Sequence, residues 1–166
     1  MAYALSIVEQ LCGQIGRKIE YDIDGEKLTV DFLMCAICNG KAYGGGFLAA
    51  PEAVPDDGWM DVVIIRKVGR LTIAKLLGMY KRGGHFVHGQ LTEQAKPYFI
   101  YRRAKLVTLR PVDGRGPIIA TADGECAPCD RVEIALHPQS ARILLPKAAY
   151  ERFCAQRENA ASAVTR

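Results

Sequence analysis

The sequence has no apolar run long enough to cross a bilayer, and residues 1–10 lack the basic patch and apolar stretch of a secretory signal. Charge of one sign is also scarce. A net charge of +4 and a pI near 8.8 allow weak attraction to anionic lipid or nucleotide, but they do not make a nucleic-acid-binding surface. We therefore expect a cytoplasmic protein without a nucleic-acid partner, in at most peripheral contact with the inner membrane face.

Further features are missing at the level of organisation. The chain shows no internal repeat and no linker, and 166 residues suffice for one domain with a proper core but not for two. In a cytoplasmic setting its six cysteines are expected to be free thiols rather than a disulfide framework. We expect one domain over residues 1–156 and a flexible tail of small and polar residues over 157–166.

The hydrophobic periodicity predicts a mainly β domain with two helices. Apolar residues at helical spacing place the helices at residues 2–16 and around 73–80, the second one ended by Gly83-Gly84. Asp24-Gly25 is a strong two-residue hairpin signal between two strands. The predicted strands cover residues 18–23, 27–39, 60–66, 98–110, 117–122, 131–137 and 141–145.

The most informative stretch is glycine-rich and runs over residues 39–61, NGKAYGGGFLAAPEAVPDDGWMD. It is not a phosphate-binding P-loop, because no Gly-Lys-Ser/Thr ends it and no helical pattern follows it. Taken alone, the triplet Gly44-Gly45-Gly46 indicates a bend or a close approach of backbones.

Several motifs in a fixed order carry a resemblance to a known family. They are Asn39-Gly40, the glycine triplet, Ala50-Pro51-Glu52-Ala53, Asp56-Asp57-Gly58, Gly83-Gly84-His85, Asp123-Gly124-Glu125 and the ending Val-Glu-Ile-Ala-Leu-His-Pro…Ile-Leu-Leu-Pro. From Tyr3 to Pro146 the chain resembles the C-terminal substrate domain of bacterial diacylglycerol kinases and related lipid kinases. The resemblance implies a β-sandwich-like fold, here incomplete at its N-terminal edge.

The resemblance also implies a reaction and a base. A lipid kinase must remove a proton from a hydroxyl as that hydroxyl attacks the γ-phosphate of ATP, and a carboxylate suits this task. The family uses the Glu of its Asp-Gly-Glu motif, which falls on Glu125, with Asp123 and Gly124 setting the turn. A surface turn is the alternative. The same letters at residues 24–26 fall in the first hairpin, where we expect only a solvated turn.

A structural Mg²⁺ is implied in the same way. The family holds it with one carboxylate and two backbone carbonyls of the Asp-Asp-Gly turn, which here are the Asp57 side chain and the carbonyls of Val54 and Trp59. An all-oxygen shell suits this hard cation. A plain type I turn before the next strand would need no metal and stays the alternative.

Two Cys-x-x-Cys pairs, Cys35/Cys38 and Cys126/Cys129, suggest a zinc module as a competing interpretation. They lie much farther apart than the ~15–20 residues of a ribbon-type zinc site. An offset of three residues in a strand also points Cys35 and Cys38 to opposite faces. Pro128 allows a turn in the second pair, which makes that pair the better candidate for a metal or a disulfide.

The histidines and a basic strip are weaker signals. His85 and His88 follow the glycines that end the second helix, so we expect loop histidines rather than metal ligands. The strip on that helix and its end comprises Arg70, Lys75, Lys81 and Arg82. Such runs are usually solvated faces, and an approach to anionic lipid is the alternative.

The chain departs from the family in one respect. It contains no Gly-Gly-Asp-Gly-Thr motif, by which the relatives' nucleotide-binding domain is recognised. We therefore expect a partner domain that binds ATP, and no kinase activity from this chain alone. A non-catalytic binding remnant of the fold stays open. So do the lipid, whether diacylglycerol, a sphingoid base, an undecaprenol-like alcohol or another glycerolipid, and a homodimer through an exposed sheet edge.

Overall fold

The computed structural model describes residues 15–164, and of residues 156–164 only the backbone. The helix predicted at residues 2–16 lies almost entirely outside this range. The chain divides after Leu136 into two compact units, which are described separately. None of the helices in the described part is long and apolar enough to span a membrane.

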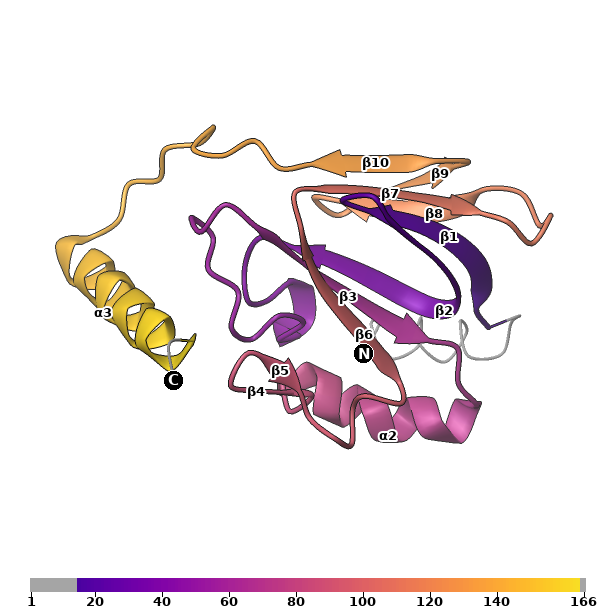
Figure 1. Ribbon diagram of the computed structural model, residues 1–166, viewed down its shortest axis with the longest axis horizontal. Coiled ribbons are helices and arrows are strands. Elements are labelled where there is room, and N and C mark those ends of the chain that lie inside the picture. Colours follow the sequence, from indigo (N-terminus) through magenta and orange to yellow (C-terminus); the bar gives the residue numbers. More distant parts are fainter. Residues whose placement is uncertain (1–14, 165–166) are drawn as a thin grey trace. The chain divides into compact units, whose positions relative to one another are not determined.

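The first unit is built on one antiparallel sheet of six strands in the order β10-β7-β1-β2-β3-β6 (Figure 1). The strands are β1 (Arg17–Ile23), β2 (Glu26–Cys38), β3 (Met60–Arg66), β6 (Phe99–Ala104), β7 (Leu106–Pro111) and β10 (Val132–Ala135). Two small hairpins add β4 (Phe86–Val87) with β5 (Gln90–Leu91), and β8 (Ile118–Ala122) with β9 (Glu125–Cys129). The predicted mainly β fold is confirmed.

The long strand β2 bends and folds the sheet into two layers. Its first half pairs with β1 and its second half with β3, and the register shifts between Phe32 and Met34. The register places Arg102 of β6 level with Ile37 of β2. In a flat sheet Arg102 would therefore lie about 36 Å from Glu26, measured along β2. Arg102 instead contacts Glu26 at 2.8 Å, so β2 curls over the face of β3 and β6. This curl produces the sandwich-like form.

Strand β3 is buried on both faces, as its continuous apolar run predicts. Met60, Val62 and Ile64 point into the first core, between the two layers of the bent sheet. Val63 and Ile65 point to the opposite face, into a second core. Helix α2 (Arg70–Lys81) covers that core and contributes Leu76 and Tyr80, the two buried side chains of the predicted amphipathic pattern.

The sequence-based element boundaries need two corrections in this unit. The strand predicted at 98–110 is two strands, β6 and β7, which meet at a corner where Asp24 accepts hydrogen bonds from the backbone of Lys105 and Leu106. Strand β9 was not predicted, because Pro128 suggested a turn. Proline fits here because β9 is an edge strand that pairs only with β8.

The second unit differs from the prediction more strongly. The strand predicted at 141–145 is wrong, since these residues have no regular structure and leave Ile143 and Leu144 exposed. Helix α3 (Lys147–Val164) follows and includes residues 157–164, for which the sequence predicts a tail. An apolar run predicts a strand only if another strand pairs with it, and no pairing reaches residues 141–145 in the described chain.

Candidate active site

The predicted base, Glu125, stands at the start of β9 directly after a two-residue hairpin turn. Ala122 pairs with Glu125 across the turn. Asp123 and Gly124 both have positive φ, 51° and 86°, which is the geometry of a type I′ hairpin. The Glu125 side chain is exposed and makes no hydrogen bond or ion pair with the described residues. The structure thus presents an exposed carboxylate at the start of a hairpin strand, without a side-chain partner among the described residues.

The predicted metal donors lie within one turn before β3. The Val54 carbonyl accepts the Asp57 N–H at 3.3 Å, and the Asp57 Oδ1 accepts the Trp59 N–H at 3.0 Å. The other carboxylate oxygen of Asp57 forms an ion pair with Arg103 on β6. The donors are of the oxygen type that suits Mg²⁺. A cation bound there would share the Asp57 carboxylate with a guanidinium.

Three residues beside this turn, Asp61, Tyr101 and Arg103, were not singled out from the sequence. Asp61 on β3 is only 5% exposed, and the Tyr101 hydroxyl donates a hydrogen bond of 2.5 Å to its Oδ1. Burial raises the pKa of Asp61, while Tyr101 and Arg103 act in the opposite direction. Arg103 pairs with Asp61 in the β3–β6 register, so it lies near both aspartates. A lone aspartate inside an otherwise apolar strand, MDVVIIR, was the signal available.

The glycine-rich loop folds back on α2. Tyr43 and Phe47 flank the triplet with stacked rings 5.6 Å apart, and Gly45 has a φ of 76°. The Tyr43 hydroxyl donates to the Tyr80 hydroxyl of α2. A Cβ at Gly83 would lie 2.6 Å from the Pro51 side chain, so a glycine is needed where the end of α2 meets this loop.

His85 is buried rather than a loop histidine on the surface. It is 0% exposed, its Nε2 lies 2.9 Å from the Ala49 carbonyl, and its ring stacks on Phe99. Burial lowers the pKa of His85, so the neutral imidazole is favoured. His88, by contrast, is an exposed turn residue with positive φ between β4 and β5. His85 therefore ties the loop after the glycine triplet to the second core.

The cysteine pairs do not assemble a metal site. Cys35 packs against the first core and Cys38 against the second, on opposite faces of β2. Burial raises the pKa of these thiols to about 12 and about 11, which favours the protonated form. Cys126 and Cys129 also lie three residues apart in a strand, β9. Among the side chains that the structure describes, residues 15–155, no group of three or more Cys, His, Asp or Glu could hold a metal.

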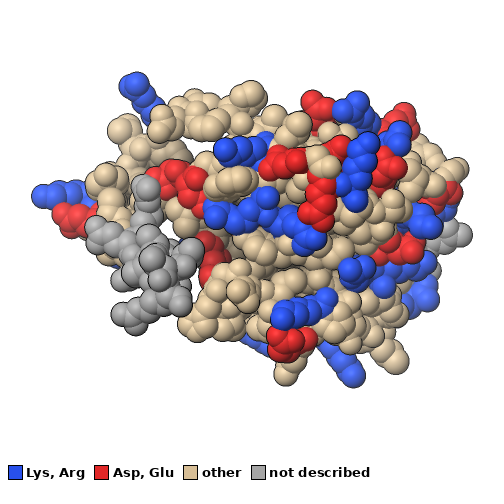
Figure 2. All heavy atoms as spheres, in the orientation of Figure 1, with Lys and Arg blue, Asp and Glu red and all other residues tan. Residues whose placement is uncertain are grey.

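The basic strip stays on the surface. Arg70, Lys75, Lys81 and Arg82 are all exposed, and Lys81 lies 5.6 Å above the Phe47 ring. On the face drawn in Figure 2, lysine and arginine side chains alternate with acidic ones and do not gather in one continuous patch. A strong electrostatic attraction to a membrane therefore finds no support on that face.

Comparison with known proteins bears on the fold and the family. The family model of the YegS C-terminal NAD kinase beta sandwich-like domain matches residues 1–145. The chain belongs to this family. It aligns with a Bacillus anthracis str. Sterne structure assigned to the diacylglycerol kinases, with a TM-score of 0.52, 16% identity, and coverage of 80% of this chain and 43% of that one. This likeness confirms the β-sandwich-like fold of the domain.

Curated relatives carry kinase names. A probable lipid kinase YegS-like protein of Xanthomonas oryzae pv. oryzae is 32% identical over 116 residues, which are 70% of this chain and 34% of the relative. A diacylglycerol kinase of Mycobacterium tuberculosis is 27% identical over 148 residues, 89% of this chain and 44% of the relative. The domain thus spans between a third and a half of the relatives' length.

Proposed function

We propose that this chain is the substrate-side part of an ATP-dependent lipid kinase, which phosphorylates the hydroxyl of diacylglycerol or a similar lipid. The family match over residues 1–145 carries this proposal, and relatives named as lipid kinases and a diacylglycerol kinase support it. The site adds a carboxylate, Glu125, that no other described residue engages. We place the enzyme in the cytoplasm, in peripheral contact with the membrane that holds its substrate.

In this proposal Glu125 is the general base. Its carboxylate accepts the proton of the lipid hydroxyl as the hydroxyl oxygen attacks the γ-phosphorus of ATP. The bond between that phosphorus and the β,γ-bridging oxygen breaks, and ADP leaves with the bond's electron pair. The products are a lipid phosphate monoester, ADP and a protonated Glu125. Asp123 and Gly124 act through the turn that places Glu125 at the start of β9.

A Mg²⁺ at the turn before β3 would be held by the Asp57 carboxylate and the carbonyls of Val54 and Trp59. Bound there, the ion supplies positive charge and fixes the conformation of the turn. Arg103 pairs with Asp57 and already places a positive charge at the same carboxylate. Replacing Arg103 with Gln should therefore raise the affinity for a divalent cation, whereas Asp57→Asn should abolish binding.

This metal site can be tested on the purified chain. Tb³⁺ replaces hard cations at oxygen sites, and Trp59 beside Asp57 can sensitise its luminescence. We expect saturable luminescence that Mg²⁺ competes away, enhanced in Arg103→Gln and lost in Asp57→Asn. Equal signals from all three proteins would show that the turn needs no metal.

ATP is expected to be bound mainly by a nucleotide-binding domain, the proposed partner of this chain. The decisive experiment measures transfer of labelled phosphate from ATP·Mg²⁺ to diacylglycerol, with this chain alone and with the nucleotide-binding part of the same enzyme added. We expect no turnover alone and turnover from the pair. Turnover by the chain alone would refute the proposal that a separate nucleotide-binding domain must bind ATP. A folded pair that phosphorylates no lipid would favour a binding remnant.

A further inference from the structure

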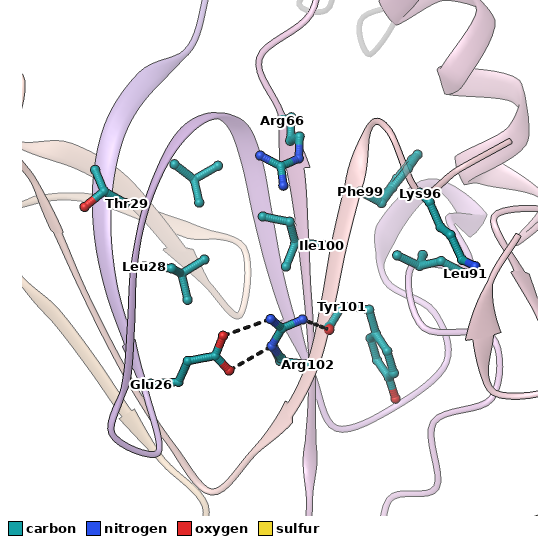
Figure 3. A pocket seen from close by; sticks show the side chains of 11 residues that line it. Glu26, Leu28, Thr29, Arg66, Leu91, Lys96, Phe99, Ile100, Tyr101 and Arg102 are labelled. Atoms are coloured by element: carbon teal, nitrogen blue, oxygen red, sulfur yellow. Dashed lines mark hydrogen bonds and ion pairs between the residues drawn. The ribbon is translucent and has the colours of Figure 1, made fainter. Parts of the chain in front are cut away.

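The bent sheet leaves an open groove of about 400 Å³ on the first unit (Figure 3). One wall comes from the start of β2 and the other from β6 and the segment before it. Its lining consists of Glu26, Leu28, Thr29, Val30, Arg66, Leu91, Lys96, Phe99, Ile100, Tyr101 and Arg102. The volume falls within the range of small-molecule sites. None of Glu125, Asp57 and Trp59 lines it, so it is distinct from the candidate active site.

The floor of the groove is apolar because it opens onto the first core. Leu28 and Ile100 are partly buried and pack against that core, to which Val30 also belongs. Phe99 and Leu91 belong to the second core, and Phe99 is only 2% exposed, so the apolar floor is formed on the side of Leu28 and Ile100. An acyl chain laid along these side chains would be removed from water, which favours binding.

The rim is cationic. Arg66 and Arg102 lie on either side of Ile100, and both extend over the same face (Figure 3). Arg102 is held by Glu26 through two hydrogen bonds of 2.9 and 2.8 Å. The guanidinium of Arg66, on the exposed end of β3, has no hydrogen bond or ion pair with the described residues. The groove thus joins an apolar floor to a cation that is free to bind an anion.

We propose that this groove binds one anionic amphiphile, with its acyl chain on Leu28 and Ile100 and its carboxylate or phosphate head group on Arg66. A guanidinium binds either head group through two parallel hydrogen bonds. Arg102 and Lys96 are paired with Glu26 and Glu93, so Arg66 is the cation of the lining that favours an anion over a neutral or cationic head group. The inference does not depend on the lipid kinase activity, because it concerns a different surface.

A purely protective role for these arginines makes a different prediction. Charged side chains on an edge strand such as β6, or at the exposed end of the strand paired with it, as Arg66 is on β3, can serve only to prevent pairing with another sheet. In that case, removing Arg66 would promote self-association and leave ligand binding unchanged. The two roles are therefore separable with the same variant.

The test uses the purified full chain without ATP, titrated with the fluorescent fatty acid cis-parinaric acid and, in competition, with lysophosphatidate. We expect saturable binding that Arg66→Gln weakens about tenfold. Glu26→Gln should tighten binding, because it releases Arg102. Arg110→Gln, which removes an exposed arginine paired with Glu20 outside the groove, should bind like the parent.

Several outcomes would overturn the proposal. These are no saturable binding by the parent, equal affinity of the parent and Arg66→Gln with self-association of the variant, and equal competition by a neutral monoacylglycerol. Competition by inorganic phosphate alone as strong as by lysophosphatidate would reduce the groove to a simple anion site. Because no phosphate transfer is measured, failure here would leave the proposed kinase function untouched.

Discussion

The tripeptide Asp-Gly-Glu occurs twice in this chain, and both copies form the same hairpin turn. The φ angles are 48° and 91° at Asp24 and Gly25, and 51° and 86° at Asp123 and Gly124. In each case the glutamate begins the second strand of the hairpin. The local sequence therefore fixes the turn in both places, whatever the surroundings.

The polar groups of the two hairpins are used differently. In the first, the Asp24 carboxylate accepts the backbone N–H groups of Lys105 and Leu106, and Glu26 is held by Arg102. In the second, neither the Asp123 nor the Glu125 side chain has a hydrogen bond or ion pair with the side chains and backbone that the structure describes. The first hairpin stabilises the bend of the sheet. The second leaves its carboxylates available, as a catalytic hairpin would require.

The largest expected difference between the hairpins is in catalysis. In the reconstituted kinase, Glu125→Gln should lower lipid phosphorylation by roughly 10²- to 10⁴-fold, because the proton acceptor is lost. Steady-state phosphate transfer from ATP measures this. The matched control is Glu20→Gln on β1, the strand that leads into the first hairpin, and it should keep full activity. An unchanged rate in a folded Glu125→Gln variant would remove Glu125 from the proposed mechanism.

The next difference is in stability. Asp24→Ala and Asp123→Ala both place alanine at positive φ, which should lower the free energy of unfolding of each variant by about 1 kcal/mol. Only Asp24→Ala also removes hydrogen bonds to two backbone N–H groups, worth about 1–2 kcal/mol more. Urea unfolding should therefore show Asp24→Ala as the less stable variant. Equal losses would mean that the corner at Lys105 does not depend on the first hairpin.

Features decided by neighbouring residues were predictable from the sequence. The turn at Asp24-Gly25, the buried strand β3 and the end of α2 at Gly83 each follow from a few adjacent positions. Strand β9 was missed because the proline rule is local, whereas the freedom of Pro128 comes from the edge position of its strand. The order of motifs led to the family by resemblance, which no single motif would have supported.

Features decided by the register of distant strands were not predictable. Asp61 and Arg103 become neighbours only through the pairing of β3 with β6, more than forty residues apart in sequence. The partnership of Glu26 with Arg102 requires the bend in β2 as well. The sequence therefore names the candidate residues Asp57 and Glu125. It does not say that Arg103 forms an ion pair with Asp57, or that the Glu125 side chain has no partner among the described residues.

The smallest expected difference is in the response of stability to pH. The ion pair with Arg102 lowers the pKa of Glu26 in the folded protein relative to the unfolded chain. The stability that the pair contributes should thus be present above the unfolded pKa of a glutamate, about 4.3, and disappear as the pH falls through the lower folded value.

Urea unfolding of the parent and Glu26→Gln between pH 3 and 7 would measure this effect. We expect the parent to have a slightly higher free energy of unfolding than Glu26→Gln at pH 7, and this difference to disappear toward pH 3. High salt should also reduce the difference, because an exposed ion pair is screened. Glu125→Gln is the matched control from the second hairpin, because the Glu125 side chain has no ion pair with the described residues. A stability difference between the parent and Glu26→Gln that does not change with pH would mean that Arg102 does not hold Glu26 in solution, and the two hairpins would then differ only at their aspartates.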